Sequence, residues 1–347
     1  MARRILWASL ALAPLTLLLD VVAHPGKTLL FLLSALSLVP LAWLIGESTE
    51  HAAEYTGARI GGLLNASFGN APELIIALIA VNDALPNVVR GSMAGSIVSN
   101  ILLVLGAAFL FGKEDNAQLD LRSLAAQLGL VAVAVVLLLV PSIPGWHGDP
   151  ERHSLQLLSI APAVVLLALY LVTTTIGLRQ TARPAEQPTG GWSLRASLAA
   201  LTVATILTAL ISELLVHSLE AFAHAAHLSE FFIAVVIVAI VGNAAEHGGA
   251  VVIARRGKMK LATEIAISSS AQVGLFVVPV VMLLSFAFSH PLTLAFRPVE
   301  LAAMGAAAVF VGVVIRDGRA RKWEGALLVG VYAAMVVAFG FAGDRGG

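Results

Sequence analysis

Apolar stretches long enough to cross a lipid bilayer follow one another along almost the whole of this chain. An α-helix needs about 20 predominantly apolar residues to span the hydrocarbon core. The chain is 59% hydrophobic and only 12% charged, with a mean hydropathy of +0.91, whereas a soluble protein of this size carries far more surface charge. The sequence therefore predicts an all-α polytopic membrane protein surrounded by membrane lipid.

Hydropathy predicts eleven transmembrane helices, separated by polar or turn-forming segments. The first segment begins with two Arg residues and contains no convincing cleavage site for a signal peptide, so we expect it to be a retained helix. The predicted helices are 5–23, 28–50, 61–82, 92–112, 122–141, 154–177, 194–220, 230–254, 261–289, 296–315 and 323–342.

Basic residues indicate which side of the membrane each loop faces. With a cytoplasmic N-terminus, 16 of the 21 Lys and Arg residues fall in cytoplasmic segments, as the positive-inside rule requires. Because the number of helices is odd, we expect the C-terminus outside, and we expect the bacterial inner (plasma) membrane as the location. The net charge of zero gives no indication of nucleic-acid binding, and the absence of Cys excludes a thiolate metal site.

Two short motifs within the apolar runs are near copies of each other. They are Gly69-Asn70-Ala71-Pro72-Glu73 and Gly242-Asn243-Ala244-Ala245-Glu246-His247. The helix that follows each motif begins with a polar set, 95–100 after the first and 267–272 after the second. This duplication predicts two five-helix repeats, and because five is odd the second repeat is inverted relative to the first.

The predicted organisation has four parts. An N-terminal helix, 1–27, precedes a first repeat, 28–178, and a cytoplasmic linker, 179–193, leads to a second, inverted repeat, 194–347. In transporters built this way, the substrate and the coupling ion bind near the membrane midplane at the repeat interface.

The motif residues suit a hard cation. Pro72 cannot donate a backbone hydrogen bond and Gly69 permits unwinding, so the helix must open and free main-chain oxygens. Carboxylates at this depth are functional candidates by default, and all-oxygen ligands suit Ca²⁺. We therefore expect Glu73, Glu246, Asn70 and Asn243 to bind the cation and to couple it to protons. The residues expected to line the site are Gly69, Gly242, Asn100, Gln272, Ser96, Ser99 and Ser269.

Three further groups are weaker candidates. His247 and Glu213 are candidates for a proton relay or gate, with packing or a salt bridge as the ordinary alternative. Glu47, Glu50 and Glu54 fall near one end of a predicted helix, where they would form a cytoplasmic acidic funnel or simply a solvated helix end. The serines have a structural alternative too, because they often bond to their own helix backbone.

Paired carboxylates in a membrane suggest exchange of a cation for protons. Two ionised carboxylates repel each other, and each carries a desolvation cost of several kcal/mol when buried. Either a divalent cation or protons neutralise the pair, since burial and a neighbouring like charge favour the protonated form of a carboxyl group. The same residues then bind Ca²⁺ or H⁺ in competition.

The motif pair resembles the paired signature motifs of the calcium/cation antiporter superfamily, and the chain is similar to its Ca²⁺/H⁺ exchanger (CAX) branch. Further matches are 45–47, 95–100, 211–213 and 269–272, and the resemblance runs from about residue 28 to the end. It implies Ca²⁺ and H⁺ as the transported ions, no cofactor, and Glu73 and Glu246 as the main ligands. Asn-Ala replaces the hydroxyl-bearing motifs typical of Na⁺-coupled branches, which favours H⁺.

Other functions stay open as alternatives. The first is a Na⁺-coupled antiporter or one selective for Mn²⁺ or Mg²⁺. The distant one is an intramembrane hydrolase, but the sequence has no His-Glu-x-x-His motif for a metalloprotease, and Ser96 or Ser99 has no evident buried His partner. We therefore expect a transporter and not an enzyme, and a homo-oligomer is left open.

Overall fold

The computed structural model describes residues 2–180 and 191–344, without the side chains of 2, 3, 57–63, 65, 66 and 178–180. Most of the predicted linker, 181–190, therefore lies outside the described residues. The α-helices are α1 (Ala2–Ser9), α2 (Leu12–Ala23), α3 (Lys27–Phe68), α4 (Ala71–Asn82), α5 (Pro86–Ser99), α6 (Leu105–Phe111), α7 (Leu121–Gly145), α8 (His153–Gln180), α9 (Leu194–Ala226), α10 (Glu230–Phe232), α11 (Ala239–Gly242), α12 (Ala244–Arg255), α13 (Met259–Gln272), α14 (Val278–Ser285), α15 (Pro298–Val314) and α16 (Lys322–Ala342).

Short irregular elements interrupt these helices. Three π-helices lie within longer helical runs: η1 (Asn100–Val104), η2 (Ile233–Val238) and η3 (Val273–Val277). A 3₁₀ turn, η4 (Ile315–Asp317), precedes the strand β2 (Arg319–Ala320), which pairs with β1 (Ala117–Gln118) in an antiparallel ladder. The π-helices were not predicted, because hydropathy has no term for the hydrogen-bond register within a helix.

The structure does not confirm eleven spans. Within the described residues, nine helices are long and apolar enough to cross a membrane. The pair Glu230–Gly242 and Ala244–Arg255, bent by 57°, makes ten if it is one span. The predicted helix 61–82 is not one helix, because α3 continues to Phe68 and α4 covers only Ala71–Asn82. The predicted gap at 51–60 is helical, since it contains no Pro and several good helix formers.

The chain folds into two compact units, and each unit draws on both halves of the sequence. Unit 1 comprises Met1–Ile79, Ala168–His227 and Val241–Ala245. Unit 2 comprises Ala80–Leu167, Leu228–Ile240 and Glu246–Gly347. The second motif therefore contributes to both units: its residues up to Ala245 belong to unit 1, and Glu246 and His247 belong to unit 2.

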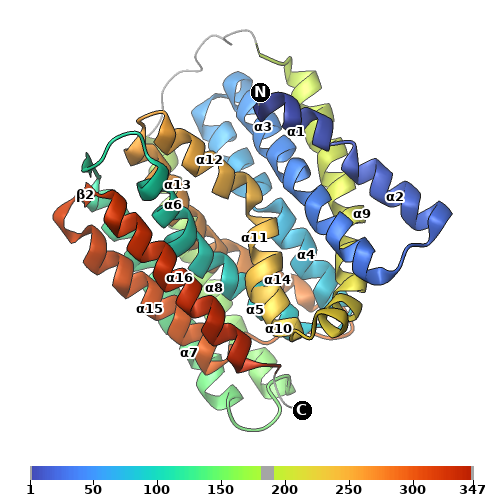
Figure 1. Cartoon of the computed structure of the whole chain (residues 1–347). Helices are drawn as coiled ribbons and strands as arrows, with labels where there is room; N and C mark the ends of the chain where they lie inside the picture. The colour runs from blue at the N-terminus through green and yellow to red at the C-terminus, as the bar shows by residue number, and fades with distance from the viewer. Residues whose placement is uncertain (1, 181–190, 345–347) are drawn as a thin grey trace. The chain divides into compact units, whose positions relative to one another are not determined.

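Unit 1 is built on α3 and α9, which run side by side (Figure 1). Their shared core consists of Leu44, Ile45, Leu201 and Ala204, with Trp43 and Trp192 among the residues packed against it. Trp7 of α1 joins this end of the unit, with its ring centroid 5.3 Å from that of Trp43 and 5.6 Å from that of Trp192. These large apolar side chains thus hold α1, α3 and the start of α9 together.

Glycines allow the helices of unit 2 to approach closely. A β-carbon at Gly95 of α5 would clash with the backbone oxygen of Val235 in η2, and one at Gly325 of α16 would lie 2.6 Å from the oxygen of Gly106 in α6. Small residues commonly mark such helix contacts in membranes. Gly95 therefore fixes how the helix that precedes the second motif packs on α5.

A buried extended segment of unit 2 was also not predicted. Between α14 and α15 the residues Leu292 to Phe296 are buried without forming a helix or strand. Their amide groups are satisfied by side chains, since Leu294 donates to the hydroxyl of Ser159 at 2.9 Å and Phe296 to that of Ser142 at 3.0 Å. These bonds remove the cost of burying an unpaired backbone.

A buried arginine anchors the same segment. Arg90 of α5 is 1% exposed, forms a 2.6 Å salt bridge with Glu151, and donates to the backbone oxygen of Thr293 at 3.2 Å. The side chain of Glu151 in turn accepts the hydroxyl hydrogen bond of Thr293 at 3.3 Å. Arg90 is thus a structural cation.

Candidate cation site

The first motif lies at a break between two helices of the same apolar run. Helix α3 ends at Phe68, Gly69 and Asn70 form the turn, and α4 begins at Ala71. Pro72 falls in the first turn of α4, where its missing N–H costs nothing, and the Leu74 amide donates to the oxygen of Asn70 at 3.1 Å. The predicted opening of the helix at this motif is confirmed.

The second motif has a shorter break. Helix α11 ends at Gly242, Asn243 alone stands between the helices, and α12 begins at Ala244 with the 57° bend. Ala245 replaces the proline of the first motif, so no side chain blocks the helical register there. Asn70 and Asn243 are both buried, at 0% and 1% exposure.

Unit 1 brings the backbone of the second motif against the carboxylate of the first. A β-carbon at Gly242 would lie 3.5 Å from Cγ of Glu73 and 3.8 Å from its Oε1. The Gly242 backbone therefore approaches Glu73 with no side chain of its own between them. Gly242, predicted only as a lining residue, is in this way a close neighbour of Glu73.

Unit 2 places four of the predicted residues in one hydrogen-bonded network. The hydroxyl of Ser269 donates to Oε2 of Glu246. Asn100 lies between Ser269 and His247: its Nδ2 donates to the Ser269 hydroxyl at 3.0 Å, and its Oδ1 lies 3.1 Å from Nε2 of His247. Helices α12 and α13 and the start of η1 each supply part of the network, which we call the Glu246 network.

The remaining polar residues predicted on these helices have mainly structural contacts. Ser99 donates to the oxygen of Ser96 within α5 at 3.3 Å, which is the back-bonding expected of serines in apolar helices. Ser270 donates across to the oxygen of Ile97 at 3.1 Å and so ties α13 to α5. Gln272 ends α13 directly before η3, and its side chain is partly buried.

The predicted acidic funnel includes a histidine that sequence reasoning missed. His51 lies 3.6 Å from a carboxylate oxygen of Glu47 and 3.6 Å from one of Glu54, while Glu50 is exposed. The His51 ring also stacks on Trp192 with centroids 5.4 Å apart. The i+4 and i+3 spacings of these residues were the signal that would have found the cluster. Glu213 lies exposed on α9, apart from this cluster.

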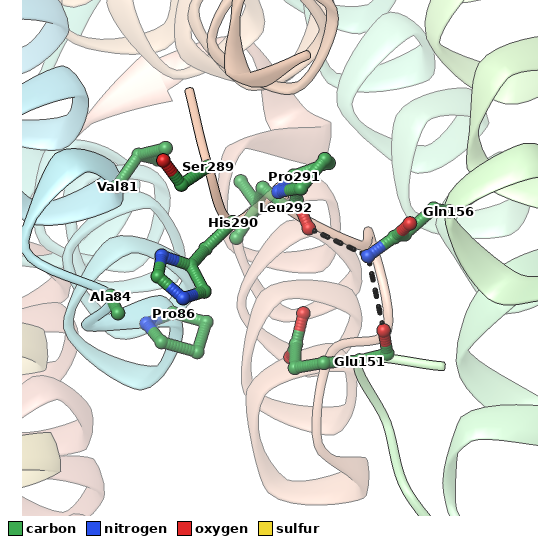
Figure 2. A pocket seen from close by; sticks show the side chains of 9 residues that line it. All are labelled: Val81, Ala84, Pro86, Glu151, Gln156, Ser289, His290, Pro291 and Leu292. Carbon is green, nitrogen blue, oxygen red and sulfur yellow. Dashed lines mark hydrogen bonds between the residues drawn. The ribbon is translucent and has the colours of Figure 1, made fainter. Parts of the chain in front are cut away.

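A pocket in unit 2 lies away from the residues of both motifs. It has a volume of about 290 Å³ and is lined by Val81, Ala84, Pro86, Glu151, Gln156 and the run from Ser289 to Leu292. Figure 2 shows the His290 ring near Pro86, and Gln156 bonded to the backbone oxygens of Pro291 and Glu151. None of its lining residues belongs to either motif. Within the described part of the chain, no three His, Asp or Glu side chains gather as metal ligands.

The fold and the duplicated break define the class of this molecule as a multi-pass membrane protein of the transporter type. The family model described as "Sodium/calcium exchanger protein" matches residues 26–178 and 196–341. The chain belongs to this family and, within the calcium/cation antiporter superfamily, to the Ca²⁺/H⁺ exchanger branch.

Similar proteins extend over nearly the full chain. It is 35% identical over 343 residues to the Ca(2+)/H(+) antiporter of Aphanothece halophytica, covering 92% of this chain and 91% of that one. It is 36% identical over 328 residues to the Ca(2+)/H(+) antiporter ChaA of Bacillus subtilis, covering 91% and 93%. The solved structure of native YfkE superposes with a TM-score of 0.85 at 34% identity, covering 97% of this chain and 99% of that one.

Proposed function

We propose that this protein exchanges Ca²⁺ for H⁺ across a membrane by alternating access, with Glu73 and Glu246 binding either ion near the midplane. The observation that carries the proposal is the duplicated helix break, with one carboxylate in the first turn of the helix after each break. Support also comes from the relatives, which are named Ca²⁺/H⁺ antiporters.

The chemistry of the two carboxylates explains why transport is an exchange. An empty and ionised site carries two half-buried charges, whose desolvation makes a change of conformation costly. Ca²⁺ removes that cost by neutralising both carboxylates, and protons do the same. The protein therefore changes its accessible side only when loaded with one ion or the other, which couples the two fluxes in opposite directions.

The inverted repeats supply the two accessible states. The family model matches twice, once on each side of the predicted linker, which supports the division into repeats 28–178 and 194–347. Repeats of opposite orientation give two related arrangements that open to opposite sides of the membrane. The N-terminal helix 1–27 is outside this symmetry, and membrane lipid surrounds the whole bundle.

Na⁺ coupling or preference for Mn²⁺ or Mg²⁺ is the competing function, and a single transport assay separates them. Purified protein in sealed vesicles with an acidic interior is supplied with radioactive Ca²⁺ outside. The proposal predicts uptake that is abolished by a protonophore, unchanged by Na⁺, and little reduced by excess Mg²⁺. Uptake that follows a Na⁺ gradient and ignores the pH gradient would show a Na⁺-coupled exchanger instead.

A further inference from the structure

Asn100 sits at the centre of the Glu246 network. It is completely buried, at the first residue of η1, and it connects Ser269 of α13 with His247 of α12. Ser269 continues the connection to the Glu246 carboxylate. Because Glu246 and His247 are neighbours in the chain, the hydrogen bonds and the backbone of α12 close a ring of four residues.

The donors and acceptors in this ring fix the orientation of the Asn100 amide. A serine hydroxyl has one hydrogen, and Ser269 uses it on Glu246, so it must accept from Nδ2 of Asn100. The amide oxygen then faces His247, which has to donate from Nε2, since Oδ1 is an acceptor only. The atom of Asn100 that would bind a cation is therefore directed at the histidine.

We propose that Asn100 is a positioning residue and not a Ca²⁺ ligand: it holds the Glu246 carboxylate through Ser269 and holds the His247 ring directly. The inference deepens the proposed function and rests on it, because the group that Asn100 positions is one of the two proposed ion-binding carboxylates. In chemical terms, the hydrogen bonds of the Asn100 amide determine which oxygen of the network faces the ion.

The local backbone explains why an asparagine at this position reaches two other helices. The π-helix η1 begins at Asn100, and its wider turn shifts the helical register. A second π-helix, η3, begins immediately after Gln272 in the second half of the chain. In both halves a polar amide side chain thus stands where a helix changes register.

Positioning of this kind matters because a glutamate side chain has several rotatable bonds. A free carboxylate would lose that freedom each time an ion binds, whereas a carboxylate already fixed by Ser269 and Asn100 does not. Hydrogen-bond partners of metal ligands typically change metal affinity by about 10- to 100-fold when removed. Asn100 should therefore affect the apparent KM for Ca²⁺ more than the maximal rate.

A double-mutant cycle in reconstituted vesicles tests the proposal. Asn100→Leu and Ser269→Ala are each expected to raise the apparent KM for Ca²⁺ by about tenfold. Since both changes break one chain of bonds, the double variant should be no worse than the weaker-binding single variant. Losses that multiply would mean that Asn100 acts independently of Ser269, and they would overturn the proposal. If Asn100→Leu does not fold, Asn100→Ala replaces it in the cycle.

A second pair of variants, at His247, distinguishes the two possible roles of Asn100, because the two roles predict changes of the KM for Ca²⁺ in opposite directions. Removing the donor with His247→Leu should raise the KM for Ca²⁺ if Asn100 positions Glu246, and His247→Gln, which keeps an N–H donor, should raise it less. If Asn100 were a ligand, His247→Leu would release its oxygen and lower the KM, which contradicts the proposal.

Transport by the unmodified protein distinguishes a failure of this inference from a failure of the proposed function. If it shows no Ca²⁺ uptake driven by the pH gradient, the proposed exchange is wrong whatever the variants do. If it exchanges normally while the cycle is multiplicative or His247→Leu lowers the KM, only the role of Asn100 is wrong.

Discussion

Glu73 and Glu246 occupy the same place in two different helices, because each is the third residue of a 12-residue helix that begins directly after a break. The N-terminal turn of a helix favours a negative charge, and the first amide groups of a helix have no partner within the helix itself. This equivalence concerns the place of each residue within its own helix. It is the strongest structural reason to treat the two residues as functional counterparts.

Neutralising either carboxylate should therefore stop transport. Glu73→Gln and Glu246→Gln keep the size of the side chain and remove its charge, so we expect exchange at background level with normal folding. Ca²⁺ uptake into vesicles measures the first, and size-exclusion chromatography in detergent measures the second. The control is Glu114→Gln, a carboxylate in an exposed loop, which should transport normally. Near-normal transport by either motif variant would remove that residue from the site.

A methyl group at Gly242 should weaken Ca²⁺ binding by occupying the space in front of Glu73. The added β-carbon would contact the Glu73 side chain at ordinary van der Waals distance, 3.5 Å from Cγ, so the fold tolerates it while the ligand loses room. We expect Gly242→Ala to raise the KM for Ca²⁺ by about tenfold, in the range seen when a metal ligand's surroundings change.

The matched control for Gly242 is Gly248→Ala, also near the start of α12, where an added β-carbon would meet nothing within 4 Å. Its KM should stay at the unmodified value. Equal KM values for the two alanine variants would show that the approach of Gly242 to Glu73 has no part in ion binding.

Gly95 tests the packing of unit 2. Because a β-carbon at Gly95 would clash with the backbone oxygen of Val235, Gly95→Ala must push η2 away from α5, and such overpacking costs typically about 1–3 kcal/mol. We expect a clearly lower apparent melting temperature in detergent. Gly129→Ala in α7, with nothing within 4 Å, should leave the temperature unchanged or raise it slightly, since alanine is the better helix former. A Gly95→Ala protein as stable as the control would contradict this contact.

The topology predicted from basic residues is open to a direct test. With the N-terminus in the cytoplasm and two repeats of opposite orientation, a reporter fused after Gly347 should lie outside the cytoplasm. Paired reporters, one active only in the cytoplasm and one only outside it, decide the location. Cytoplasmic activity at Gly347 would mean an even number of crossings and would contradict the predicted count of eleven.

Hydropathy predicted the helical class and most helix positions, whereas the site residues named from the duplicated motifs stay a prediction. The opening at Gly69 and Asn70 followed from Pro72, whose missing N–H acts locally. The continuation of α3 to Phe68 was missed because polarity marks a membrane boundary and does not end a helix. The buried segment around Thr293 was missed because its backbone is satisfied by Ser142, Ser159 and Arg90, which are distant in sequence.

At the site, too, local features were predicted and contacts between residues distant in sequence were not. Sequence reasoning gave Asn100 and Ser269 as lining residues and His247 as a relay candidate, and unit 2 links all three in a hydrogen-bond network in which Ser269 contacts Glu246. It did not find the order of the hydrogen bonds, because the direction of an amide depends on which partners face it. The contacts of His51 with Glu47 and Glu54 are local, and their i+4 and i+3 spacings along one helix are enough to predict them.

The central claim is that Ca²⁺ and protons compete for the same carboxylates, and calorimetric titration tests it most directly. Ca²⁺ is titrated into the detergent-solubilised protein at several pH values, in buffers with different ionisation enthalpies, so that released protons are counted. Ca²⁺ must displace the protons that the carboxyl groups hold, so the apparent Kd should rise as the pH falls. Proton release should shrink in Glu73→Gln and in Glu246→Gln, wherever these variants still bind. Binding that releases no protons and keeps the same affinity at every pH would contradict exchange at a shared site.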